Sequence, residues 1–263
     1  MKYAFWGTPE FAAIILEKMI LGGTPPALVI CNPDRPVGRK KIITAPATKI
    51  IAQKYNIPVW QSEKLEPRDA KAKIGNFDFA VVAAYSKILP KEILAMPRLG
   101  TIGVHPSLLP LYRGATPIQS VILNGEEQTG ISLYLMDESV DHGPILAQQA
   151  IYENLAELNY ETLMRHLAEL SGEMLLGFLS EFIKGEIAPE IQDEKKATFT
   201  KKFKTEDGFV DLTKDDPKMI LRKIRALNSE PGVYTLKEGR RMKILDAKII
   251  DGKLKLKKIQ FEG

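Results

Sequence analysis

Two residues in this sequence could carry acid–base chemistry, and each stands in a loop directly after an apolar run. Leu99 to Val104 reads as a buried strand, and it is followed at once by His105 and by prolines that cannot continue a strand ladder. Asp141 stands in a second polar loop, residues 136–144, which is rich in turn-forming residues. Imidazole titrates near neutral pH, and a neighbouring carboxylate can hold its protonated form or relay a proton through water. His105 and Asp141 are therefore candidates for general acid–base catalysis, although each could equally be a structural residue, at a strand end and in a turn.

The elements that position these residues are predicted from the start of the chain. Lys2 to Trp6 reads as a strand, residues 11–20 have the apolar spacing of a helix, and Ala27 to Cys31 reads as a second buried strand. This strand–helix–strand unit predicts an α/β fold with a Rossmann-like, mostly parallel sheet and flanking helices. Open sheets of this class bind ligands at the carboxyl ends of their strands, where His105 is expected. No G-x-G-x-x-G motif follows the first strand, which disfavours a dinucleotide.

The remaining pattern predicts a large domain, a linker and a small C-terminal domain. In the large domain we expect strands at 57–60, 77–84, 99–104, 130–136 and 145–151, and helices at 47–55, 66–74, 115–123 and 158–182. In the small domain we expect a helix at 216–227 and strands at 233–236, 242–250 and 253–260, with a tight turn at 251–252. The expected boundaries are 1–183 for the catalytic domain, 184–206 for the linker and 207–263 for the small domain.

Composition and charge argue against several classes of protein, among them membrane, secreted and disulfide-linked proteins. The chain has no apolar run of 18 residues and no signal-peptide pattern, so we expect neither a membrane span nor secretion, and the cytoplasm is the expected compartment. Cys31 is the only cysteine, which excludes an intrachain disulfide and a cysteine-based metal cluster. Residues 201–263 hold 17 Lys and Arg against 10 Asp and Glu, a net charge of +7, whereas the whole chain carries +4. This basic region indicates either a polyanionic partner or simply a solvated, lysine-rich surface.

Four stretches of sequence together resemble the 10-formyltetrahydrofolate-dependent formyltransferase family. They are HPSLLP at 105–110 with RG at 113–114, DESVDHGPI at 137–145, GTPEFA at 7–12 and NPDRPVGR at 32–39. The resemblance covers roughly residues 1–250, and the last two stretches are most similar to the branch of the family that formylates methionyl-tRNA. It implies a catalytic α/β domain followed by an OB-like β domain. Because about 30 residues after the Pro-Gly turn are few for a five-stranded barrel, we expect that domain to be short, reduced or truncated.

The resemblance also implies an activity and its site residues. The reaction would move a formyl group from the co-substrate 10-formyltetrahydrofolate to the α-amine of initiator methionyl-tRNA, for translation initiation, in a monomer that needs no metal. His105 and Asp141 would be catalytic. The folate would contact the loop after His105 and the segment after strand 77–84, with the candidates Ser107, Leu108, Leu109, Pro110, Ile88 and Leu89.

The exposed basic loop after Cys31 resembles the loop with which the family holds the tRNA acceptor end. Guanidinium forks and lysine charges suit phosphate contacts, although a solvated turn has the same composition. The candidate tRNA-binding residues are Arg35, Arg39, Lys40 and Lys41.

Gly103 departs from the family pattern. The family has an asparagine two residues before the histidine, and its amide helps to hold the oxyanion, whereas glycine has no side chain to donate. Loss of one such donor costs about 2.7–4 kcal/mol in a comparable enzyme. Three explanations stay open: a natural variant compensated by another donor, a substitution made to trap substrate, or a binding protein that has lost its chemistry.

Two alternative functions also stay open at this point. A nucleotide-sugar N-formyltransferase acting on a 4-amino sugar would share the histidine, the aspartate and the folate. A catalytically impaired folate- or tRNA-binding homologue would share the fold without the turnover. The basic loop at 35–41 and the basic C-terminal region favour tRNA over a sugar.

Overall fold

The fold is described by a computed structural model for residues 1–38, 40–152 and 154–261. The chain forms two compact units. The first comprises Met1–Leu111, Gly130–Gln149 and Arg165–Ala197, and the second comprises Tyr112–Thr129, Ala150–Met164 and Thr198–Gly263. Two segments of the expected catalytic domain, 112–129 and 150–164, therefore group with the C-terminal region in this division. The boundaries 1–183, 184–206 and 207–263 stay a prediction.

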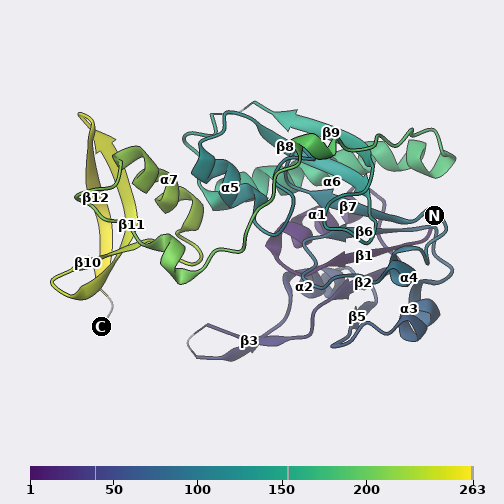
Figure 1. The fold of residues 1–263 in the computed structure, drawn as a ribbon. Coiled ribbons are helices and arrows are strands. Elements are labelled where there is room, and N and C mark those ends of the chain that lie inside the picture. The colour runs from purple at the N-terminus through teal and green to yellow at the C-terminus, as the bar shows by residue number, and fades with distance from the viewer. Residues whose placement is uncertain (39, 153, 262–263) are drawn as a thin grey trace. The chain divides into compact units, whose positions relative to one another are not determined.

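A seven-stranded sheet forms the centre of the first unit (Figure 1), in the order β5-β2-β1-β6-β7-β8-β9. The pairs β5–β2, β2–β1, β1–β6 and β6–β7 are parallel, and β7–β8 is antiparallel. This topology confirms the predicted Rossmann-like, mostly parallel sheet. The strands are β1 (Tyr3–Gly7), β2 (Leu28–Cys31), β5 (Val59–Gln61), β6 (Phe79–Ala83), β7 (Thr101–His105), β8 (Thr129–Leu135) and β9 (Ile145–Ile151).

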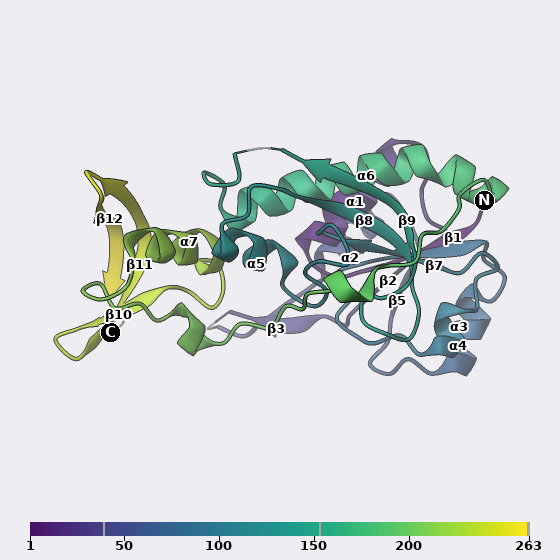
Figure 2. The same cartoon turned by 45° about the horizontal axis from the view of Figure 1, so that its top comes forward.

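Helices cover both faces of this sheet, which is why its central strands are apolar throughout. On one face, Tyr3 stacks on Phe79, and Phe79 meets Phe182 of the long helix α6 (Tyr160–Lys184) edge-on at 5.9 Å between ring centroids. Helix α1 (Glu10–Leu21) lies beside α6 (Figure 2), where Lys18 pairs with Glu169 and Glu173.

The opposite face packs on α3 (Pro67–Ile74) and the short α4 (Lys91–Leu94). One buried cluster joins Ala4, Trp6, Leu28 and Ile30 of the strands to Ala70, Ile74, Ile93 and Leu94 of these helices. Alternate residues of β1 thus point to opposite layers, as strand geometry requires.

The predicted elements are present with small shifts of their ends, including α2 (Ala47–Lys54) and α5 (Pro117–Asn124). Two features were not predicted. The basic loop after Cys31 contains a two-stranded hairpin, β3 (Arg35–Val37) and β4 (Ile42–Thr44), and α4 follows the loop after β6. The predicted linker contains a short 3-10 turn, Glu194–Lys196, and a second one, Thr205–Gly208, crosses its C-terminal end.

The C-terminal region forms a three-stranded antiparallel sheet, as predicted. Its strands are β10 (Tyr234–Lys237), β11 (Arg240–Ile250) and β12 (Lys253–Phe261), and they follow α7 (Pro217–Leu227). Asp251 and Gly252 join the last two strands with φ angles of 51° and 73°, the left-handed pair that a tight two-residue hairpin favours. Asp216 caps α7 by accepting a hydrogen bond from the Met219 backbone N–H at 2.9 Å.

Within the described residues, none of the helices is both long and apolar enough to span a membrane.

Candidate active site

His105 and Asp141, predicted to act together, lie side by side at the carboxyl end of β7. His105 is the last residue of this strand, and its Nδ1 lies 3.5 Å from Oδ2 of Asp141. The two side chains are only 7% and 16% exposed, so little water screens the attraction between them when the imidazole is protonated. The geometry suits a carboxylate that orients a histidine and stabilises its charged form.

Tyr134 also reaches Asp141, and the sequence reasoning did not single it out. Its hydroxyl donates a hydrogen bond of 2.7 Å to Oδ1 of Asp141, the carboxylate oxygen not facing His105. Burial raises the pKa of Tyr134 well above its usual range, and the neighbouring negative charge of Asp141 adds to the shift. The phenol therefore stays protonated and remains a donor.

The Asp141 loop is fixed by a residue from the predicted linker. Asp141 has a φ angle of 50°, in the left-handed region that non-glycine residues rarely adopt. The buried amide of Gln192 donates to the backbone oxygens of Asp141 at 3.0 Å and Gly143 at 2.7 Å. Gln192 was missed because only the folded chain brings it to this loop.

The loop after His105 is held by two polar side chains of the neighbouring strands. Ser132 on β8 donates to the Ser107 carbonyl at 2.7 Å and accepts from the Leu109 N–H at 2.9 Å. Gln148 on β9 donates to Ser132 Oγ and to the Leu109 carbonyl. The Ser107 hydroxyl donates to the Leu111 carbonyl at 2.6 Å, so the predicted folate loop has a fixed backbone. In this loop Ser107 and Leu109 are buried, and Leu108 and Pro110 are half-buried.

Ile88 and Leu89, the two candidates for contacting the folate after β6, differ in exposure. Ile88 is 83% exposed, and its side chain is open to a ligand. Leu89 is 5% exposed and belongs to the buried cluster that contains Trp6. Only Ile88 therefore offers side-chain surface.

Two buried polar atoms near the carboxyl ends of β2 and β6 lack hydrogen-bond partners among the described residues. They are Oδ1 of Asn32 and the hydroxyl oxygen of Tyr85. The amide nitrogen of Asn32 is satisfied, since it donates to Ser86 Oγ at 2.9 Å, and burial raises the pKa of Tyr85 to about 12. Buried polar groups are usually paired, so these two atoms suit a polar ligand.

Three of the four predicted tRNA-binding residues lie on the exposed hairpin β3–β4 and its turn: Arg35, Lys40 and Lys41. The fourth, Arg39, lies outside the described residues. The hairpin also exposes the apolar side chains of Val37, Ile42 and Ile43. Asp34 at its base is tied to Lys49 by an ion pair of 2.8 Å, so its charge is balanced locally.

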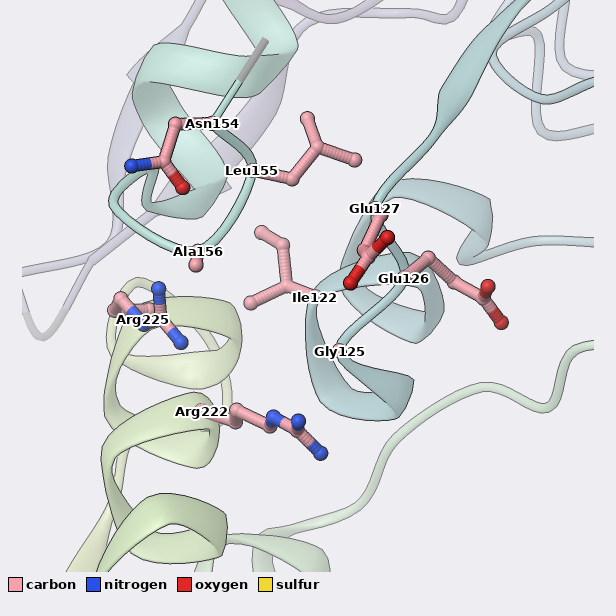
Figure 3. Close-up of a pocket in the computed structure, with 9 residues that line it drawn as sticks. All are labelled: Ile122, Gly125, Glu126, Glu127, Asn154, Leu155, Ala156, Arg222 and Arg225. Atoms are coloured by element: carbon pink, nitrogen blue, oxygen red, sulfur yellow. The ribbon is translucent and has the colours of Figure 1, made fainter. Parts of the chain in front are cut away.

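The second unit contains a cavity of about 410 Å³ between α5, α7 and residues 154–156 (Figure 3). None of the predicted site residues lines it. Arg222 and Arg225 of α7 enter it from one side, and Glu126 and Glu127 follow α5 on the other. Nε and Nη1 of Arg225 are buried without a partner among the described residues, and burial lowers the pKa of Arg225. The mixed charges of the lining give the cavity no preference for one sign of ligand.

No group of three or more His, Cys, Asp or Glu side chains in the described part of the chain is placed to hold a metal ion.

Comparison with known sequences agrees with this geometry. The formyl transferase family model matches residues 1–179, and the model of the formyl transferase C-terminal domain matches residues 202–262. The chain is 38% identical to a methionyl-tRNA formyltransferase of Thermotoga maritima, covering 100% of this chain and 91% of that protein. It is 37% identical to a methionyl-tRNA formyltransferase of Staphylococcus aureus (strain MW2), covering 95% and 80%.

Solved structures share the fold. A methionyl-tRNA formyltransferase from Clostridium thermocellum superposes with a TM-score of 0.65 at 20% identity, covering 100% of this chain and 99% of that one. HypX from Aquifex aeolicus in complex with tetrahydrofolic acid gives a TM-score of 0.67 at 20% identity; the match covers 94% of this chain but spans only 38% of HypX. With the His105–Asp141 pair at the strand end, and two family models matched in order, the chain belongs to the formyl transferase family.

Proposed function

We propose that this chain transfers a formyl group from 10-formyltetrahydrofolate to the α-amine of initiator methionyl-tRNA, for translation initiation. The observation that carries the proposal is the buried His105–Asp141 pair in a chain 37–39% identical to methionyl-tRNA formyltransferases over at least 95% of its length. A monomer in the cytoplasm is part of the proposal, because translation initiation takes place in that compartment.

His105 and Asp141 are the proposed catalytic residues. Attack of an amine on a formyl carbon releases a proton from the amine and builds negative charge on the formyl oxygen. Asp141 lies on the Nδ1 side of His105, so we assign proton exchange with the substrate to Nε2. The carboxylate then stabilises the imidazolium that forms and holds the ring in one orientation.

The folate is the proposed co-substrate, and when bound it supplies the formyl group. Two features support its place beside His105. The unpartnered Asn32 Oδ1 and Tyr85 hydroxyl can pair with a polar heterocycle, and the exposed Ile88 provides an apolar contact. The loop at 107–110, fixed by Ser132, follows the histidine directly.

The tRNA is the proposed acceptor, held in part by Arg35, Arg39, Lys40 and Lys41. The three described members of this set are exposed cations that can pair with phosphates. The exposed apolar side chains of Val37, Ile42 and Ile43 beside them offer further surface for contact with the acceptor.

An acceptor competition tests this proposal. The protein is given 10-formyltetrahydrofolate, initiator methionyl-tRNA and a 4-amino-sugar nucleotide at equal concentrations, and both formylated products are measured. We expect formyl-methionyl-tRNA alone, at a rate that falls as salt is raised, because phosphate contacts are screened. Formylation of the sugar alone would identify a sugar N-formyltransferase. Folate binding without either product would identify an impaired homologue, and either result overturns the proposal.

A further inference from the structure

Gly103 and Tyr134 form a directly opposed pair across the antiparallel strands β7 and β8. The ring of Tyr134 lies over the glycine: a Cβ built on Gly103 would stand 2.3 Å from Cε1 and 2.8 Å from the hydroxyl oxygen. These distances are too short for any side chain at position 103 while the ring stays in place. The absence of a side chain at Gly103 therefore leaves the space that the Tyr134 ring occupies. Aromatic rings cover strand glycines in this way in other sheets.

The position of the ring brings the Tyr134 hydroxyl next to Asp141, which in turn faces His105. Tyr134 is 4% exposed, and its hydroxyl reaches Asp141 Oδ1 at 2.7 Å, while Asp141 Oδ2 faces His105 Nδ1 at 3.5 Å. His105 lies two residues from Gly103 on the same strand, so both point to the face that Tyr134 covers. A continuous set of contacts therefore runs from Gly103 through Tyr134 and Asp141 to His105.

We propose that Tyr134 is a positioning residue: its hydroxyl, in the space left by Gly103, holds the Asp141 carboxylate against His105. This inference rests on the proposed proton transfer at His105. A hydrogen bond to a charged group in a buried site stabilises that charge and fixes its direction. Without it, Oδ1 of Asp141 would lose its phenol donor and the carboxylate could rotate away from Nδ1.

The described neighbours of Asp141 come from several elements. The groups facing Asp141 are His105 from β7 and Tyr134 from β8, with the Gln192 amide on its backbone oxygen. Asp137 on the same loop also acts on Tyr134, and its Oδ2 lies 2.6 Å from Nδ1 of His142. Removing the phenol takes a donor from Asp141 Oδ1, so the carboxylate is held less firmly against His105.

The test is Tyr134→Phe, which keeps the ring over Gly103 and removes only the hydroxyl. We expect kcat for formyl transfer to fall about tenfold or more. KM for both substrates should change less than twofold, because the loss falls on proton transfer and not on substrate binding. The matched control is Tyr3→Phe, which removes another buried phenol with a 2.6 Å hydrogen bond, to the Thr24 carbonyl. That control should leave kcat unchanged.

A double-mutant cycle separates positioning from a general packing effect. If Tyr134 acts through Asp141, adding Tyr134→Phe to Asp141→Asn should cost little further activity, because the carboxylate is already gone. The inference would be overturned if the double variant lost activity by the product of the two single losses, or if Tyr134→Phe kept the wild-type kcat. Full activity in His105→Gln would contradict the proposed function itself. A failure of the Tyr134 inference alone would leave His105→Gln inactive, so the two failures can be told apart.

Discussion

At the scale of single residues, the site depends on a glycine and on the tyrosine opposite to it. The family resemblance gave position 103 to an asparagine that donates to the oxyanion. In this chain the ring of Tyr134 fills that volume, and its hydroxyl points at Asp141. A side chain at position 103 and the Tyr134 ring exclude one another, so the two positions have to change together.

Gly103→Asn should therefore lower kcat instead of raising it, because the new Cβ displaces the Tyr134 ring from Asp141. Adding Tyr134→Ala opens the volume, and the double variant should turn over faster than Gly103→Asn alone. The measurement is kcat for wild type, both single variants and the double variant. A rise in kcat for Gly103→Asn alone, with Tyr134 still present, would show that the ring does not occupy this space in solution.

At the scale of elements, helix α7 contains a buried arginine that destabilises the fold and that the sequence pattern does not indicate. The basic residues of α7 are typical of a helix face that is exposed to water. However, Nε and Nη1 of Arg225 are buried without a partner among the described residues. Its neighbour Arg222 is better placed, since its Nη1 donates to the Asn124 carbonyl at 3.4 Å. A donor that loses water without gaining a partner destabilises the fold.

Arg225→Met should accordingly raise the free energy of unfolding by about 0.5–1 kcal/mol, a value reduced because the side chain is only partly buried. The readout is the midpoint of urea denaturation at constant slope. Arg222→Met is the matched control and should bring no gain. Equal losses of stability in both variants would show that Arg225 has a partner in solution.

At the scale of the whole molecule, local signals in the sequence predicted the sheet and the C-terminal strands, and the family resemblance implied that His105 acts with Asp141. Strand ends, prolines and apolar runs are readable along the chain. Tyr134 and Gln192 could not be found in this way. The role of Tyr134 depends on which strand pairs with β7, and Gln192 contacts a residue 51 positions away. The hairpin β3–β4 has little sequence signal, because Pro36 and the charged residues of this segment favour a loop over a strand.

The measurement that tests the central claim most directly is single-turnover formylation of initiator methionyl-tRNA, with enzyme in excess and saturating 10-formyltetrahydrofolate. It compares the wild type with His105→Gln and, as a control, with His166→Gln, an exposed histidine of α6. We expect rapid transfer by wild type and control, and a rate lower by about 10² to 10⁴ for His105→Gln, as for other enzymes that lose an acid–base group. Equal rates for all three proteins would contradict it, because the proton transfer would then not depend on His105.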